Sequence, residues 1–151
     1  MGQMNKNGSK IQIKELEEDF INDSFFKTLS NLSEVGKLSK EVFREIKKSN
    51  NINIYVAFID NELVGTITII VEQKFIHNGG RVCHIEDLAT REGYENLGVG
   101  SKLIEKAIKL ATDERCYKII LDCSQHNLTY YKKFGFYQHE ISMRYDIPNT
   151  N

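Results

Sequence analysis

Tryptophan is absent from this chain of 151 residues, and only one proline and three cysteines occur in it. An odd number of cysteines without a CxxC pair provides neither a disulfide framework nor the ligand spacing of a metal site. We therefore expect no metal and reduced thiols, with Cys83 and Cys123 as small core residues of strands.

Long apolar runs are also absent, and the first nine residues are polar. A membrane-spanning helix needs about 20 apolar residues and a signal peptide needs an apolar core, so we expect neither. The 20 basic side chains balance the 21 acidic ones, which gives no reason to expect nucleic acid or a membrane as a partner. These absences favour a cytoplasmic protein.

The chain has the length of one domain with its own core, and no repeat or linker divides it. We expect a disordered tail over residues 1–9 and a single domain over residues 10–147.

The spacing of apolar residues predicts a mixed α/β fold. Strands are expected at residues 11–16, 52–59, 63–71 with a continuation over 74–77, 83–89, 118–123 and 136–145. Helices are expected at 20–29 with Asp19 as N-cap, at 39–48 with Ser39 as N-cap and Val42, Phe43 and Ile46 buried, from 97 onward, and at 128–134. The apolar run at 119–121 suits a central strand that is buried on both faces.

Two glycines, Gly98 and Gly100, open the helix that follows a polar loop at residues 90–96. The first backbone N–H groups of a helix have no intrahelical acceptor and lie at the positive end of the helix dipole. A glycine-rich helix start therefore suits a phosphate or a pyrophosphate, although two such glycines can also be only a structural cap.

Three kinds of phosphate-binding loop use such glycines, and their spacing separates them. A P-loop requires a lysine where Val99 stands. A dinucleotide fingerprint requires a third glycine where Leu103 stands, although Asp122 falls where a ribose-binding acid would. Residues 95–100 resemble the pyrophosphate loop of the GNAT superfamily of acetyl-CoA-dependent N-acetyltransferases, except that Glu95 replaces the usual Gln or Arg. Because an acid beside a pyrophosphate is unfavourable, we expect Glu95 to point to solvent.

Acidic and hydroxyl side chains are the candidates for chemistry. Asp122 closes the predicted central strand, and ligands of α/β sheets lie at such strand ends. Glu86 and Asp87 are adjacent on a strand and face opposite sides of it, so one of them can be an ordinary solvated side chain. Tyr131 follows Tyr130 on a short helix, where one of the two must pack.

Four longer motifs resemble one family of that superfamily, the glucosamine 6-phosphate N-acetyltransferases. They are KFIH at residues 74–77, HIEDLA at 84–89, CYKIILDC at 116–123 and YYKKFGF at 130–136. The resemblance runs from about residue 33 to residue 143. It implies the GNAT fold, a central, mostly antiparallel mixed sheet flanked by helices. It also implies acetylation of glucosamine 6-phosphate by acetyl-CoA on the route to UDP-N-acetylglucosamine.

The resemblance further implies where the two substrates bind. Acetyl-CoA would contact Tyr131, the strand residues Leu88, Ala89 and Thr90, and the loop residues Asn96, Leu97, Gly98, Val99, Gly100 and Ser101. The sugar phosphate would contact Ser33, Lys74, Phe75, Ile76, His77, Glu86, Asp87 and Asp122, in a homodimer whose sugar sites draw on both chains. Asp146 stands where the family can use a phosphate-binding arginine, which leaves Arg144 as the nearby cation.

As catalytic residues the resemblance implies Tyr131, Asp122 and Glu86. The sugar amine would attack the thioester directly, with a backbone N–H near Leu88 holding the oxyanion. The Tyr131 hydroxyl would protonate the departing thiolate, and Asp122 or Glu86 would orient the amine. Two alternatives remain open, a GNAT enzyme that acts on another small amine and a non-catalytic acyl-CoA-binding module.

Overall fold

The chain forms two units in the computed structural model, residues 1–120 and residues 121–151. The structure describes residues 8, 10–30, 32 and 40–149. The expected tail at residues 1–9 lies outside the described residues except for Gly8, and so do Ser33 and the expected N-cap Ser39.

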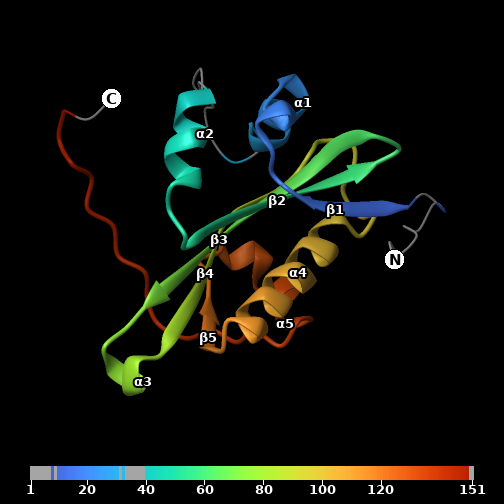
Figure 1. Ribbon diagram of the computed structural model, residues 1–151. Coiled ribbons are helices and arrows are strands. Elements are labelled where there is room, and N and C mark those ends of the chain that lie inside the picture. The colour runs from blue at the N-terminus through green and yellow to red at the C-terminus, as the bar shows by residue number, and fades with distance from the viewer. Residues whose placement is uncertain (1–7, 9, 31, 33–39, 150–151) are drawn as a thin grey trace. The chain divides into compact units, whose positions relative to one another are not determined.

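A mixed five-stranded sheet is the centre of residues 1–120 (Figure 1). Its strands stand in chain order: β1 (Ile11–Glu15), β2 (Ile52–Ile59), β3 (Glu62–Gln73), β4 (Arg81–Thr90) and β5 (Cys116–Ile120). The first three pairings are antiparallel, and β4 pairs with β5 in parallel. The expected α/β fold with a mixed, mostly antiparallel sheet is confirmed.

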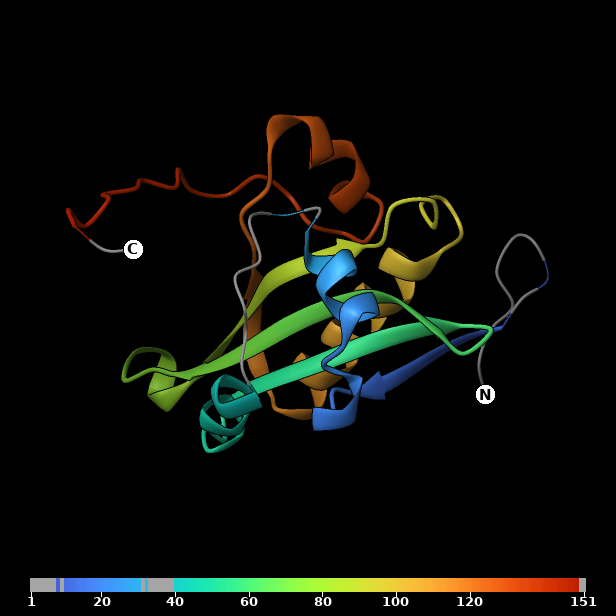
Figure 2. The same cartoon turned by 90° about the horizontal axis from the view of Figure 1, so that it is seen from above.

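Helices cover both faces of this sheet (Figures 1 and 2). On one face lies α4 (Val99–Asp113), whose buried residues are Val99, Leu103, Ile104, Ala107 and Ala111. On the other lie α1 (Asp23–Leu29) and α2 (Lys40–Lys47), where Phe25 and Phe43 join a core cluster with Leu16, Val56 and Leu63. The apolar residues that recur at helical spacing in α4 are therefore the ones that this helix buries against the sheet. In α2 only Phe43 is buried, and Val42, expected inside, is exposed.

The first helix begins later than the sequence pattern suggested. The chain makes a short 3₁₀ turn, η1 (Glu18–Phe20), and Asp19 lies within it. Asn22 is the actual N-cap of α1, and its Oδ1 accepts hydrogen bonds from the N–H groups of Ser24 (3.1 Å) and Phe25 (3.3 Å). Because Asn22 satisfies these first helical N–H groups, the helix starts at Asp23, and the prediction of Asp19 as its cap is wrong.

The predicted continuation of β3 over residues 74–77 is also wrong. β3 ends at Gln73, and a short helical turn, α3 (Ile76–Gly79), connects it to β4. His77 and Asn78 adopt left-handed backbone angles, with φ of 51° and 59°. A strand cannot continue through two such residues, so the chain turns back at once into β4.

The run that was expected to form a central strand forms the edge strand β5. This strand pairs with β4, ends at Ile120, and has exposed or half-buried residues throughout. Asp122 and Cys123, which follow it, are both exposed. Continuous hydrophobicity was therefore a poor indicator of position in the sheet, and Cys123 is not a core residue.

Residues 121–151 contain the turn η2 (Gln125–Asn127) and the short helix α5 (Leu128–Lys132), which confirms the helix predicted near Tyr131. Residues 136–147 carry no assigned strand, contrary to the strand predicted at 136–145. Five large apolar side chains of this segment are exposed: Tyr137, Ile141, Met143, Tyr145 and Ile147. Within the described part of the chain, no helix is long and apolar enough to cross a membrane.

Gly65 on β3 allows α4 to approach the sheet. A Cβ atom at this position would lie 2.5 Å from Cγ1 of Val99 and 3.0 Å from Cδ1 of Leu103. We expect Gly65→Ala to lower the free energy of unfolding by about 1–3 kcal/mol, because the helix start must move away from the sheet. The midpoint of urea denaturation measures this change, and an unchanged midpoint would contradict the close contact.

Cys83, buried on β4, makes stability depend on pH in the alkaline range. Burial, with a smaller contribution from Cys116, raises the pKa of its thiol to about 12 from an ordinary value of 9.0. As the pH rises, the unfolded chain loses this proton before the folded chain does. The thiol's contribution to the free energy of unfolding is therefore complete below about pH 9 and is lost as the pH rises toward 12. We expect the free energy of unfolding to fall less steeply above pH 9 in Cys83→Ala than in the wild type. Parallel slopes would contradict the burial of a neutral thiol.

Candidate functional site

The start of α4 has the geometry of an anion-binding site. Gly98 is its N-cap and adopts a left-handed conformation (φ 93°), and Asn96 before it has φ 63°. The first intrahelical bond of α4 runs from the N–H of Lys102 to the carbonyl of Gly98 (3.1 Å). The N–H groups of Val99, Gly100 and Ser101 precede that bond at the positive end of the dipole. The predicted pyrophosphate loop therefore has a backbone suited to its role.

Glu95 is exposed, as expected, but its carboxylate has a structural contact. Its Oε2 accepts a hydrogen bond from the N–H of Gly93 at 2.8 Å. Gly93 itself has φ 90°, a conformation that favours glycine. The acid thus closes the loop before α4 on itself, which accounts for a carboxylate at a position where the superfamily uses Gln or Arg.

β4, which carries the residues expected to hold pantetheine, extends beyond its parallel ladder with β5. The ladder between β4 and β5 runs from the pair Arg81 and Cys116 to the pair His84 and Ile120, whereas β4 continues to Thr90. The residues expected beside pantetheine, Leu88, Ala89 and Thr90, lie in that extension. A strand edge beyond its ladder can pair with the amide groups of an extended ligand.

A β-bulge interrupts β4 within the same stretch. Thr66 of β3 pairs with Ala89 and Thr68 pairs with Glu86, so that Asp87 and Leu88 oppose the single residue Ile67. Asp87 takes the left-handed conformation that the irregularity needs (φ 47°). A bulge removes a residue from the regular ladder and redirects its backbone groups, which suits the proposed oxyanion donor near Leu88.

Glu86 belongs to a polar row on the face of the sheet opposite α4. Its cross-strand neighbour is Thr68, and the next residue of β4 on this face, His84, pairs with Ile70. The row continues to Glu72, whose Oε1 lies 3.5 Å from Nε2 of His84 and 2.8 Å from Nζ of Lys74. The hydrogen bond from Lys74 lowers the pKa of Glu72, and Glu72 in turn raises the pKa of Lys74. The predicted residues Glu86 and Lys74 are thus parts of one polar row.

The other predicted sugar contacts of residues 74–77 lie in the turn between β3 and β4. Phe75 is fully exposed and Ile76 is 62% exposed. The ring of His77 stacks on Tyr117, with centroids 4.1 Å apart. Two large apolar side chains of this turn are therefore open to solvent beside a histidine whose ring is packed.

Asp122, Tyr131 and Arg144 belong to residues 121–151. Asp122 is exposed, contrary to its predicted place at the end of a buried strand, and its Oδ2 lies 3.5 Å from the hydroxyl of Ser142. Arg144 is paired with Asp146 at 2.6 Å, so the cation nearest to the missing family arginine is bound by the residue that replaces it.

Tyr131 is half-buried between aromatic rings, with centroids at 5.3 Å for Tyr130 and 6.1 Å for Phe136. Burial raises the pKa of its hydroxyl, with smaller contributions from Tyr130 and Cys123. The phenol therefore keeps its proton at neutral pH, as a general acid requires. Tyr130 also packs on Phe134, with centroids 5.3 Å apart, so both tyrosines of the pair contact other rings.

Sequence reasoning missed several residues around these positions. Glu72 and Gln73 directly precede the KFIH motif, and Arg81 begins the strand that carries HIED. Their polar contacts join residues that are far apart in the sequence or that come together only when the turn forms. The only feature of the sequence that could have pointed to them was their position next to the motifs.

Comparison with known proteins agrees with this geometry. The chain matches the acetyltransferase (GNAT) family over residues 15–136. It is 32% identical to glucosamine 6-phosphate N-acetyltransferase 1 of Dictyostelium discoideum, over 91% of this chain and 92% of that protein. It is 33% identical to the glucosamine 6-phosphate N-acetyltransferase of Candida albicans, over 80% and 85%.

A solved structure gives the same result for the fold. The crystal structure of glucosamine-6-phosphate N-acetyltransferase from Arabidopsis thaliana superimposes with a TM-score of 0.85 at 28% identity, covering 91% of this chain and 98% of that one. The match extends over nearly the full length of both chains. The chain therefore belongs to the acetyltransferase (GNAT) family.

Proposed function

We propose that this protein transfers the acetyl group of acetyl-CoA to the amine of D-glucosamine 6-phosphate, giving N-acetyl-D-glucosamine 6-phosphate and CoA. One observation carries the acyl-CoA part. This observation is that β4 extends beyond its ladder with β5, has a β-bulge at Asp87, and leads into the glycine-capped start of α4. The names of the relatives, together with the HIED and KFIH motifs, supply the sugar phosphate as acceptor.

The residues of this chain have separate tasks in that reaction. The N–H groups at the start of α4 bind the pyrophosphate, and the strand edge at Leu88, Ala89 and Thr90 holds the pantetheine. A backbone N–H at the bulge donates to the oxyanion that forms when the amine attacks the thioester carbonyl. Tyr131 gives its proton to the departing thiolate, and Glu86 or Asp122 orients the amine and accepts its proton.

Several features support one catalytic domain over residues 10–147. The family match runs from residue 15 to residue 136 and crosses the boundary between the two units at residue 120. The expected catalytic residues lie on both sides of that boundary, Glu86 before it and Asp122 and Tyr131 after it. We place this domain in the cytoplasm, on the route to UDP-N-acetylglucosamine.

The alternatives differ in which residues they require. A GNAT enzyme for another small amine would use the same start of α4, but it would have no need of Lys74 near the acceptor. A non-catalytic acyl-CoA-binding module would have no need of a protonated Tyr131 or of the acids. Thiol release from acetyl-CoA, measured against a panel of amino sugars, polyamines and aminoglycosides, separates the three.

Selectivity for the phosphate is the direct test of the acceptor. We expect kcat/KM for glucosamine 6-phosphate to exceed that for glucosamine by at least about 100-fold, and Lys74→Ala to reduce this ratio by roughly 10- to 100-fold, because a charged contact is lost. Lys48→Ala, which removes an exposed lysine paired at 2.7 Å with Glu45, serves as the control. Equal kcat/KM for the two sugars in the wild type would refute the phosphate-sugar assignment.

A homodimer is the second part of the proposal. The exposed apolar side chains of residues 136–147 and of the turn at Phe75 and Ile76 support it, because a second copy would remove them from water. We expect the wild type to sediment as a dimer and Ile141→Asp to shift it toward monomer. Val42→Asp, an apolar-to-acid change at an exposed position of α2, should remain dimeric. A wild-type monomer with full activity would contradict the shared sugar site.

A further inference from the structure

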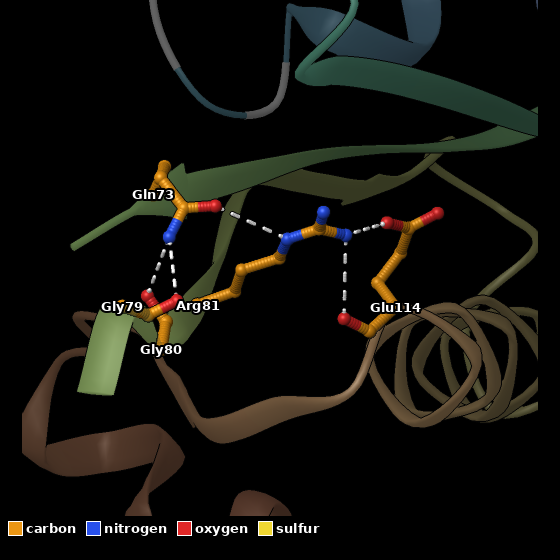
Figure 3. Close-up of polar contacts among 5 residues, drawn as sticks. All are labelled: Gln73, Gly79, Gly80, Arg81 and Glu114. Atoms are coloured by element: carbon orange, nitrogen blue, oxygen red, sulfur yellow. Dashed lines mark hydrogen bonds and ion pairs between the residues drawn. The ribbon is translucent and has the colours of Figure 1, made fainter. Parts of the chain in front are cut away.

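The side chain of Gln73 clamps the turn that connects β3 to β4. Its Nε2 donates to the carbonyl of Gly79 at 2.6 Å and to that of Gly80 at 3.4 Å (Figure 3). It also donates to the carbonyl of Lys74 at 3.2 Å. These carbonyls belong to both ends of the turn. One amide group therefore closes the whole segment of residues 74–80.

Arg81 determines which way this amide faces. Its Nε lies 3.4 Å from Oε1 of Gln73, and its Nη1 donates to Oε2 of Glu114 at 2.6 Å and to the backbone carbonyl of Glu114 at 3.5 Å (Figure 3). A guanidinium only donates, so the amide oxygen of Gln73 must face it and the amide nitrogen must face the carbonyls of the turn. Glu114 is the C-cap of α4, so the end of that helix fixes Arg81.

Tyr117 on β5 anchors the same turn from a second side. The ring of His77 stacks on it, and a Cβ atom at Gly80 would lie 2.8 Å from its ring. With the amide clamp on one side and this ring on the other, the left-handed residues His77 and Asn78 are held in place. The turn therefore presents Lys74, Phe75 and Ile76 from a fixed backbone.

We propose that Gln73, oriented by Arg81 and Glu114, is a positioning residue for the acceptor site, because it sets the conformation of residues 74–77. This inference rests on the proposed function, in which those residues contact the sugar phosphate. It gives α4 two tasks, since its first residues bind the pyrophosphate and its C-cap holds the acceptor turn through Arg81. Gln73, Arg81 and Glu114 line a surface groove together with Asn50, Asn51, Asn53 and Val71, so substitutions there leave the apolar core unchanged.

Steady-state kinetics of Gln73→Ala and Gln73→Glu test the clamp. We expect KM for glucosamine 6-phosphate to rise on the order of five- to tenfold in both variants, because the lost contacts join exposed groups and are individually weak. KM for acetyl-CoA should remain unchanged. Gln73→Glu keeps the shape but replaces the donor by a carboxylate that repels the three carbonyls, so it should be no better than Gln73→Ala. Glu114→Gln keeps an acceptor for Arg81 and should stay close to the wild type.

A double-mutant cycle tests whether Arg81 acts through Gln73. Arg81→Gln alone should raise the sugar KM, and the double variant Gln73→Ala/Arg81→Gln should be no worse than Gln73→Ala. Lys109→Gln removes an exposed ion pair with Asp113 (2.7 Å) on the same helix and should change neither KM. Additive effects of the two substitutions would overturn the proposed chain of contacts.

Hydrogen exchange gives a readout that needs no substrate. The N–H groups of Gly79 and Gly80 donate to the carbonyls of Phe75 and Ile76, each at 3.1 Å, and Gln73→Ala should speed their exchange at least severalfold. If Gln73→Ala exchanges at the wild-type rate and keeps the wild-type sugar KM, the positioning role is refuted, and the proposed function is not affected. A wild-type enzyme that does not acetylate glucosamine 6-phosphate would refute the proposed function instead, whatever the exchange rates.

Discussion

The close packing of α4 on the sheet is the contact on which the candidate site depends. Gly65 leaves room for Val99 and Leu103, and this contact holds the first turn of the helix directly above β3. The proposed pyrophosphate site consists of backbone N–H groups, which cannot adjust by side-chain rotation if the helix is displaced. Because the bulged strand β4 runs beside β3, the same contact also fixes the distance between the helix start and the proposed oxyanion donor.

The sequence predicted those features whose signals are local. The glycines at the start of α4, the helical spacing within it, and the β-forming runs of β1 to β4 lie within a few residues of what they determine, and the structure has these elements near where they were expected. The turn at residues 74–80 was misjudged because its shape depends on Gln73, Arg81 and Tyr117, which are brought together only by folding. Sequence spacing contains no record of such contacts.

Two further errors share a different physical cause. Residues 119–121 were predicted to lie in a central strand because they form a continuous apolar run, and residues 136–145 were predicted to form a last strand. Instead β5 is the edge strand of the sheet, and residues 136–147 carry no assigned strand. Hydrophobicity reports that a residue is removed from water, not what removes it. In a homodimer the same signal is satisfied by a second copy.

The Arg81–Glu114 pair shows why stability and positioning must be judged separately. Both side chains are nearly half exposed (45% and 46%), and an ion pair of that kind typically adds only about 0–1 kcal/mol to stability. Its effect on geometry is larger, because it decides which end of the Gln73 amide meets the carbonyls of the turn. If the amide were reversed, its oxygen would face the carbonyl oxygens of the turn, and the turn would lose the hydrogen bonds that the Gln73 amide donates. A contact that adds little to stability can therefore still decide which of two backbone conformations of similar energy the turn adopts. Acetyl transfer requires aligned reacting groups, so it depends on that conformation.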